Sequence, residues 1–147
     1  MNVFNIRRAF EDKKRKGWDR LYFAIDLHDT IIEGKYNKFN EGANVFPYAT
    51  EFFKWAHSRK DIVLILWTSS WDDALDKTLQ RLVEDHIWFD YINENPEVQN
   101  SELCDFNKKF YFNVLLDDKA GFVGETDWKL IIDELKEIGE WHQKANP

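Results

Sequence analysis

The sequence predicts an α/β fold in which helices sandwich a mainly parallel sheet, giving three layers of the Rossmann-like type. The main observations are two continuous apolar runs, residues 21–25 (LYFAI) and 62–67 (IVLILW). Each run is too short for a buried helix, and its continuity is typical of a strand covered on both faces. Segments with helical spacing of apolar residues alternate with such runs, which favours a parallel sheet. The 147 residues correspond to a single domain, residues 1–147.

The first half of the chain is expected to form two helices and two strands. An amphipathic helix should carry Val3, Ile6 and Phe10, end near Gly17 and pack on the flank of the domain. A strand over 21–26 follows, then a loop or hairpin flap over 31–46, which contains Gly and Asn residues typical of turns. Pro47 suits the first turn of the next helix, which precedes the strand over 62–67.

The second half should continue the alternation of helices and strands. Ser70 is expected to cap a helix with a buried stripe, and Thr126 to cap the last helix. The stripe of the first helix is expected to contain Ala74, Leu75, Leu79, Leu82, Val83 and His86, and that of the last Trp128, Ile131, Ile132, Leu135, Ile138 and Trp141. Between them, short strands over 88–92 and 110–116 flank a polar segment over 93–102.

Charge and cysteine content restrict the function classes. The net charge of −7 argues against general coating of nucleic acid. Residues 1–20, a basic N-terminal helix, hold seven basic and three acidic residues, which indicates a solvated helix face or a docking patch for a polyanion. The single cysteine, Cys104, is expected to be a small buried apolar group. With no leader sequence and no apolar run long enough for a membrane span, a cytoplasmic location is expected.

Polar clusters follow three of the expected strands, and we expect them to form one site. These clusters are residues 26–30, 68–70 and 117–118. In an open α/β sheet, ligands bind in the crevice beyond the carboxyl ends of the strands, where distant residues converge. Carboxylates, a hydroxyl and a nearby lysine are what phosphoryl transfer to an aspartate requires, with Mg²⁺ held by the acids. His57, His86 and His142 have no metal-ligand spacing.

The motifs resemble those of the haloacid dehalogenase (HAD) superfamily, in the order found there. An apolar strand precedes Asp26-Leu27-His28-Asp29-Thr30, which is similar to the D-x-D-x-T motif of that family. A second strand ends in Thr68, a lysine follows at Lys108 or Lys109, and an acidic pair, Asp117-Asp118, follows another strand. The four motifs span residues 21–125. The sequence around them is most similar to small, capless HAD-type proteins.

The resemblance implies a role for each matching residue. Asp26 would be the nucleophile, forming an aspartyl-phosphate, and Mg²⁺ would be bound by Asp26, the main-chain carbonyl of His28, Asp117 and Asp118. Thr68 would hydrogen-bond the phosphoryl group. Lys109, preferred over Lys108 for its spacing to the acidic pair, would offset negative charge. Asp29 is expected to serve local structure.

His28 departs from the family pattern, because HAD phosphatases place a second Asp there as general acid and base. Imidazole titrates near neutral pH and can donate a proton itself, whereas an inert residue would leave a slow enzyme. Two functions therefore stay open. One is a Mg²⁺-dependent phosphohydrolase, and the other is a catalytically degenerate HAD-fold module that binds metal, phosphate or a protein partner.

The sequence leaves no room for a cap domain, so the site should be open. An open site either admits a large phosphorylated substrate, such as a protein or nucleic-acid end, or borrows a lid from another subunit. A nucleotide is also a candidate substrate. Trp71 is placed to stack on a base or sugar at the entrance, although packing against the flap is the alternative. A receiver domain uses similar residues, but it places the acidic pair first, whereas this chain places it last.

Overall fold

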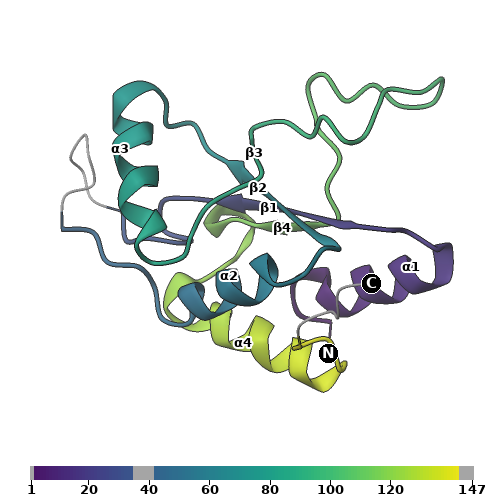
Figure 1. Cartoon of the computed structure of the whole chain (residues 1–147), viewed down its shortest axis with the longest axis horizontal. Coiled ribbons are helices and arrows are strands. Elements are labelled where there is room, and N and C mark those ends of the chain that lie inside the picture. The colour runs from purple at the N-terminus through teal and green to yellow at the C-terminus, as the bar shows by residue number, and fades with distance from the viewer. Residues whose placement is uncertain (1, 35–41, 143–147) are drawn as a thin grey trace.

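The computed structural model of the protein describes residues 2–34 and 42–142. Its elements, in chain order, are the 3-10 helix η1 (Val3–Asn5), α1 (Ile6–Lys16), β1 (Leu21–Asp26), α2 (Ala49–His57), β2 (Ile62–Trp67), α3 (Asp72–Val83), β3 (Tyr91–Ile92), β4 (Val114–Leu116), the 3-10 helix η2 (Asp118–Ala120) and α4 (Gly124–Glu137) (Figure 1). The α/β class expected from the sequence is confirmed. No described helix combines the length and the apolar character that crossing a membrane requires.

The four strands form one parallel sheet in the order β3-β2-β1-β4. From β1 the chain adds β2 and β3 on one side, and then returns across the sheet to add β4 on the other side of β1. The register places Asp26 opposite Trp67 and Ile25 opposite Leu116. The direction of strand addition therefore reverses beside β1, and ligands bind at such a reversal in open α/β sheets.

The strands expected over 88–92 and 110–116 are shorter in the structure, at two and three residues. Side chains interrupt the pairing of β3 with β2 and of β4 with β1. Asp90 Oδ2 accepts a hydrogen bond of 2.8 Å from a backbone N–H of β2, and Asn113 Oδ1 accepts one of 2.8 Å from a backbone N–H of β1. Because a carboxylate and an amide replace main-chain acceptors there, regular pairing stops at these residues.

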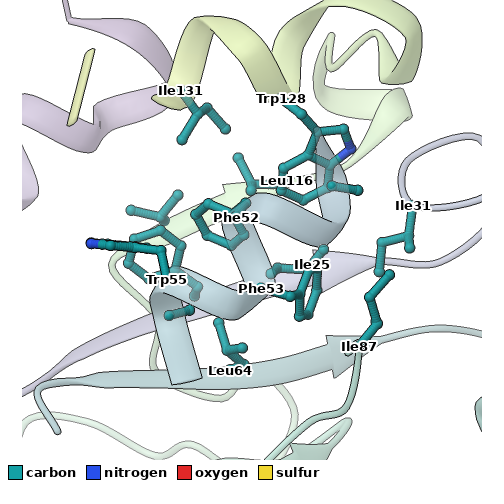
Figure 2. Close-up of a cluster of buried hydrophobic side chains, with 14 of the residues drawn as sticks. Ile25, Ile31, Phe52, Phe53, Trp55, Leu64, Ile87, Leu116, Trp128 and Ile131 are labelled. Carbon is teal, nitrogen blue, oxygen red and sulfur yellow. The ribbon is translucent and has the colours of Figure 1, made fainter. Parts of the chain in front are cut away.

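The main core lies between the sheet and the helices, and aromatic rings fill much of it, as the composition predicts (Figure 2). Trp128 of α4 is fully buried, and its ring centroid lies 5.1 Å from that of Phe52 and 6.0 Å from that of Phe53. Ile6 and Phe10 of α1 join the same cluster. The N-terminal helix therefore packs against the domain, as expected.

The other face of the sheet carries a smaller apolar cluster. Ala24 of β1 and Val63 and Ile65 of β2 alternate with core residues along their strands and pack with Phe110. In Figure 1 the connection from β3 to β4, residues 93–113, runs on the side of the sheet opposite α2 and α4. Among the described residues, this irregular connection supplies the aromatic cover of that face.

The start of α3 differs from the expectation, which placed Ser70 as its cap. The helix begins at Asp72, and the residue before it makes no side-chain cap hydrogen bond. The N–H of Ser70 donates to Thr68 Oγ1 at 3.1 Å instead, so Ser70 belongs to the turn after β2. The helix also ends at Val83, which is 52% exposed, so Val83 and the exposed His86 lie outside the buried stripe.

The start of α4 also corrects an expectation, because Thr126 does not cap it. The helix begins at Gly124, two residues earlier. Asp127 Oδ2 accepts a hydrogen bond of 2.7 Å from the N–H of Val123, and the Thr126 hydroxyl donates to the same carboxylate at 2.9 Å. A carboxylate in the first turn suits the positive end of the helix dipole, so Asp127 satisfies the helix start.

The basic charge of the N-terminal segment is largely paired within the domain. The ion pairs are Arg7 with Glu134 (2.6 Å), Lys13 with Asp61 (3.3 Å), Arg15 with Asp12 (2.7 Å) and Arg20 with Glu97 (2.6 Å). Helix α1 ends at Gly17, whose φ of 69° suits a glycine C-cap. These pairs favour a packed helix face over a patch for a polyanion.

The flap expected over 31–46 has hairpin-like sides. Ile32 forms an antiparallel bridge with Val45, and the N–H of Phe46 donates to the carbonyl of Ile31 at 2.9 Å. Residues 35–41, the expected tip, lie outside the described residues. The two sides of the flap therefore enter the core beside the end of β1.

Candidate active site

The three acidic residues expected at strand ends lie together in the structure. Asp26 is the last residue of β1, and Asp117 and Asp118 directly follow β4, which pairs with β1. One carboxylate oxygen from each lies within 4.8 Å of the other two. Because adjacent parallel strands end at the same edge of the sheet, residues far apart in the sequence meet there.

Thr30 connects the loop after β1 to the loop after β4. Its hydroxyl donates to Asp26 Oδ2 at 3.3 Å and accepts a hydrogen bond of 3.1 Å from the N–H of Asp118. Its carbonyl accepts a hydrogen bond of 2.8 Å from the indole of Trp128 in the main core. This fully buried neutral residue therefore fixes Asp26 and Asp118 relative to each other.

The surroundings of Asp26 disfavour its ionisation. Burial, the hydrogen bond to Asp118 and the charge of Asp117 raise the pKa of Asp26 to about 7. Burial also opposes ionisation of Asp118, but hydrogen bonds from the Asp26 carboxyl and the charge of Lys119 hold the pKa of Asp118 below its usual value. At neutral pH this pair therefore shares a proton, which a bound cation would displace.

The donor atoms of this acidic cluster suit a hard divalent cation. Carboxylate oxygens are the protein ligands that Mg²⁺ prefers, and three converge here. Asp117 Oδ1 accepts a hydrogen bond of 2.8 Å from the N–H of Lys119, which orients this carboxylate at the start of η2. Across residues 2–34 and 42–142, no other group of three His, Cys, Asp or Glu side chains has metal-binding spacing.

The acidic cluster lines an open pocket of about 460 Å³. The other lining residues are His28, Asp29, Trp67, Thr68, Ser69 and Lys119. His28 and Thr68, both expected in the site, are thus beside the carboxylates, and both are partly buried. A group that enters the pocket can contact carboxylates, an imidazole, hydroxyls and an ammonium group.

The turn that carries Thr68 is held by Asn93, a residue that follows β3. The N–H of Thr68 donates to Asn93 Oδ1 at 2.9 Å, and Asn93 Nδ2 donates to the carbonyl of Thr68 at 2.8 Å. The two bonds form a closed pair, which fixes the backbone after β2. Asn93 has a positive φ of 56°, a conformation that Asn tolerates well. This role of Asn93 could not be predicted, because no short-range pattern in the sequence links the two residues.

The lysine beside the acidic cluster differs from the one expected. Lys119 lines the pocket, with Nζ 3.7 Å from Asp118 Oδ2, whereas Lys109 is not among its lining residues. Lys108 lines a neighbouring pocket instead. Lys109 lies on the irregular connection before β4 and is exposed. The position of Lys119 directly after the acidic pair was the available sequence signal.

Asp29 contributes to the shape of the loop, as expected. It adopts a positive φ of 59°, and its Oδ1 accepts a hydrogen bond of 2.9 Å from the N–H of Gly34. A Cβ atom on Gly34 would meet the Asp29 carboxylate at 2.7 Å. A larger residue at position 34 would therefore displace this carboxylate from the hydrogen bond.

The tryptophan that lines the pocket is Trp67, which was expected only as the end of a strand. Its side chain is 43% exposed. Trp71, the expected stacking residue, is 76% exposed and is not among the lining residues. Cys104 is also exposed, which corrects the expectation that it is buried, because it lies on the irregular connection between β3 and β4.

Comparisons with known proteins add evidence on the fold. No protein-family model matches the sequence, and no curated protein matches it. Among solved structures, a conserved protein coded by a locus from Bacteroides thetaiotaomicron is similar, with a TM-score of 0.61 and 23% sequence identity. The match covers 85% of this chain and 99% of that chain. At this level of identity, the likeness shows a shared fold.

Proposed function

We propose that this protein is a Mg²⁺-dependent phosphohydrolase of the HAD type that acts through an aspartyl-phosphate on Asp26. The observation that carries the proposal is the convergence of Asp26, Asp117 and Asp118 within 4.8 Å at the end of the sheet where the strand order reverses. Like charges packed this closely repel one another unless a proton or a bound cation offsets them, and such clusters are typical of functional sites. The motif order in the sequence supports the same assignment.

The acidic cluster would hold the metal ion together with the main-chain carbonyl of His28. When bound, Mg²⁺ offsets the negative charge on the phosphoryl oxygens and helps to orient the substrate phosphate. Asp26 would then be held as a carboxylate, although its pKa without metal is about 7. Thr30 fixes one of its oxygens through a hydrogen bond of 3.3 Å, and the other is the candidate nucleophile.

The proposed reaction has two displacements at phosphorus. In the first, an Asp26 oxygen attacks the phosphorus of a phosphate monoester. The bond from phosphorus to the leaving oxygen breaks, and that oxygen takes a proton from the His28 imidazolium. In the second, His28 takes a proton from the attacking water, the bond from phosphorus to Asp26 breaks, and inorganic phosphate leaves with the Asp26 carboxylate restored.

Other pocket residues would bind the phosphoryl oxygens. The Thr68 hydroxyl is presented by a turn that Asn93 holds with two hydrogen bonds. Lys119 contributes a positive charge at the rim, 3.7 Å from Asp118. A donor on a turn fixed in this way before the reaction, such as Thr68, stabilises developing charge without reorganising, which is the main source of catalysis in phosphoryl transfer.

The test compares phosphate release by the natural sequence with that by Asp26→Asn. With Mg²⁺ present, p-nitrophenyl phosphate and nucleoside monophosphates should release phosphate, and Asp26→Asn should reduce release to background. Asp73→Asn, on the exposed side of α3, is the matched control and should match the natural sequence. Turnover that persists in Asp26→Asn would contradict the assignment of the nucleophile.

His28 also supports a second candidate function, a degenerate module that binds metal and phosphate without turnover. The residue lines the pocket where an acid and base is needed, and its side chain is not the carboxylate found in related phosphatases. His28→Asp separates the two functions. If the natural sequence is active and His28→Asp changes its rate only severalfold, the enzyme assignment holds. If activity arises only in His28→Asp, the natural protein is the degenerate form.

A further inference from the structure

Trp67 and Phe110 connect the active-site pocket to a second pocket. Trp67 lies opposite Asp26 in the pairing of β1 with β2, so both side chains project on the same face of the sheet. This is the face covered by Phe110 and the connection 93–113. The rings of Trp67 and Phe110 meet edge to face, with centroids 5.5 Å apart. Phe110 in turn lines the second pocket.

The second pocket, of about 480 Å³, is built mainly from carboxamide side chains and aromatic rings. The carboxamides are Asn93, Asn95, Gln99, Asn100 and Asn107, and the rings are Phe106 and Phe110. One residue of each charge, Glu94 and Lys108, leaves the lining close to neutral. Asn93 also clamps Thr68, so the two pockets share a wall.

The wall of the second pocket is held in place by Glu97. This carboxylate accepts hydrogen bonds of 2.6 Å from Arg20, 2.7 Å from the Tyr91 hydroxyl and 3.3 Å from the Tyr22 hydroxyl. The connection from β3 to β4 is thereby fixed to the strands beneath it. A pocket formed before ligand binding needs less ordering when the ligand enters.

Two carboxamides in the second pocket are also fixed individually. Gln99 Nε2 donates to the carbonyl of Pro96 at 3.0 Å, and Asn100 Oδ1 accepts from the N–H of Phe106 at 2.7 Å. Within the described part of the chain, the Gln99 carbonyl and the Asn100 amino group remain available as an acceptor and a donor. An acceptor and a donor of this kind are the groups that bond the edge of a nucleobase, whose ring can stack on an exposed indole.

We propose that the second pocket binds the leaving group of the substrate and that this group is a nucleoside, with its base against Trp67 and the carboxamides. This inference rests on the proposed function only where it concerns hydrolysis of the phosphate. The second pocket can bind a nucleoside that carries no phosphate. The near-neutral lining favours a neutral base over a charged peptide. The exposed indole face favours a planar ring over a sugar alone.

The binding test uses adenosine, which carries no phosphate. Saturation-transfer NMR should detect adenosine binding to the natural protein, and Trp67→Ala should lower the signal severalfold. Trp67→Phe should restore most of it, because a ring remains for stacking and the fold is kept. Trp71→Ala is the matched control, since this exposed tryptophan lines neither pocket, and it should behave like the natural protein.

The kinetic test compares adenosine 5′-monophosphate with ribose 5-phosphate, which lacks the base. We expect kcat/KM to favour the nucleotide, and Trp67→Ala to reduce this preference about tenfold, as loss of one stacked base would. Gln99→Ala should reduce the preference severalfold. Trp71→Ala should leave it unchanged.

The outcomes separate the two proposals. If no phosphate ester is hydrolysed but adenosine binds in a Trp67-dependent manner, the phosphohydrolase proposal fails and the nucleoside subsite stands. If esters are hydrolysed without preference for the nucleotide and adenosine does not bind, the subsite is wrong and the phosphohydrolase stands. A preference for ribose 5-phosphate over the nucleotide would overturn the base assignment and indicate a sugar subsite.

Discussion

Two clusters of charged side chains lie at opposite ends of the same sheet, one partly buried and rich in carboxylates, the other built around a buried ion pair. At the carboxyl end, Asp26, Asp117 and Asp118 bring like charges within 4.8 Å of one another. At the amino end, before β2, the buried Arg59 guanidinium bonds Asp61 at 2.9 and 2.8 Å and Glu140 Oε2 at 2.8 Å. In the acidic cluster the nearby cation is the exposed Lys119 at the rim of the pocket. In the second cluster the Arg59 guanidinium offsets the charge of the carboxylates that it bonds.

The difference appears in the pKa of the carboxylate at each end of the sheet. Lys13 approaches Asp61 at 3.3 Å, and Arg59 also lies over the ring of Trp55, 5.4 Å from its centroid. Burial opposes the ionisation of Asp61, but Arg59 and Lys13 hold the pKa of Asp61 below its usual value. Asp26 has the opposite shift, to about 7. A carboxyl group whose pKa is raised by burial and by neighbouring acids is a candidate for a functional site.

Breaking the neutralised cluster should have the largest effect on stability. Arg59→Met keeps much of the apolar stem but leaves the buried Asp61 carboxylate with a weaker partner. We expect the free energy of unfolding to fall by about 3 to 5 kcal/mol, as measured by urea denaturation.

Lys129→Met provides the control for this comparison. Lys129 and Asp133 form an exposed i,i+4 pair with 2.8 Å between Nζ and Oδ2. Its loss should leave the denaturation midpoint close to that of the natural protein, because solvent screens such pairs. An equal loss in both variants would show that burial does not distinguish the two kinds of ion pair.

Adding Mg²⁺ should supply the charge that the acidic cluster lacks. At a free Mg²⁺ concentration of 100 times its Kd, the free energy of unfolding should rise by about 2.7 kcal/mol. Thermal denaturation with and without Mg²⁺ measures this rise, and Asp117→Asn should remove most of it. Asp133→Asn, in an exposed pair on α4, should leave the rise intact. A shift of equal size in the Asp117→Asn variant would place the ion elsewhere.

When no metal is present, the contributions of Asp26 and Asp61 to the free energy of unfolding should change with pH in opposite directions. The pKa of Asp26 is raised to about 7, so the stability it provides is present at low pH and is lost as the pH rises toward 7. The lowered pKa of Asp61 has the reverse effect, and its contribution is lost only as the pH falls below the usual aspartate range.

Asp26→Asn isolates the first of these effects. Between pH 4.5 and 7.5, in EDTA, the variant should gain about 1 to 2 kcal/mol relative to the natural protein, since solvent screens the half-buried carboxylate. Urea denaturation of both proteins across this pH range measures the difference between their free energies of unfolding. Other titrating groups affect both proteins equally, so their contribution cancels in this difference. A difference that stays constant with pH would mean that Asp26 is ionised throughout.

The predictable parts of the molecule are those that depend on local pattern. The continuous apolar runs predicted β1 and β2 with their correct ends, because a strand buried on both faces excludes polar residues. The polar residues after β1 and β4 could be assigned to one site, since parallel strands end at one edge. Both inferences need only neighbouring residues and the topology of a parallel sheet.

The parts that escaped prediction depend on contacts between distant residues. β4 begins only after Asn113, whose side chain takes over an acceptor position, and Lys109 on the connection before it does not line the pocket. The roles of Asn93 and Trp67 appear only when the connection from β3 to β4 is placed over the second face of the sheet. No periodicity in the sequence encodes these contacts.

The smallest effect we predict tests whether neutral hydrogen bonds, rather than charges, hold the acidic cluster in place. Thr30→Val removes the hydroxyl that donates to Asp26 and accepts from the N–H of Asp118, and the unfolding free energy should fall by about 1 kcal/mol. Thr78→Val is the control, because the buried Thr78 hydroxyl donates to the Ala74 carbonyl of its own helix at 2.9 Å and that carbonyl keeps a backbone partner.

The Thr30 variant also sharpens the contrast between the two ends of the sheet. If the hydroxyl fixes the carboxylates, Thr30→Val should weaken Mg²⁺ binding several-fold as measured by titration calorimetry, whereas Thr78→Val should not. Unchanged Mg²⁺ affinity in Thr30→Val would mean that the metal ion itself draws the carboxylates together. In that case the like charges, and not the loop that Thr30 closes, would determine the geometry of the site.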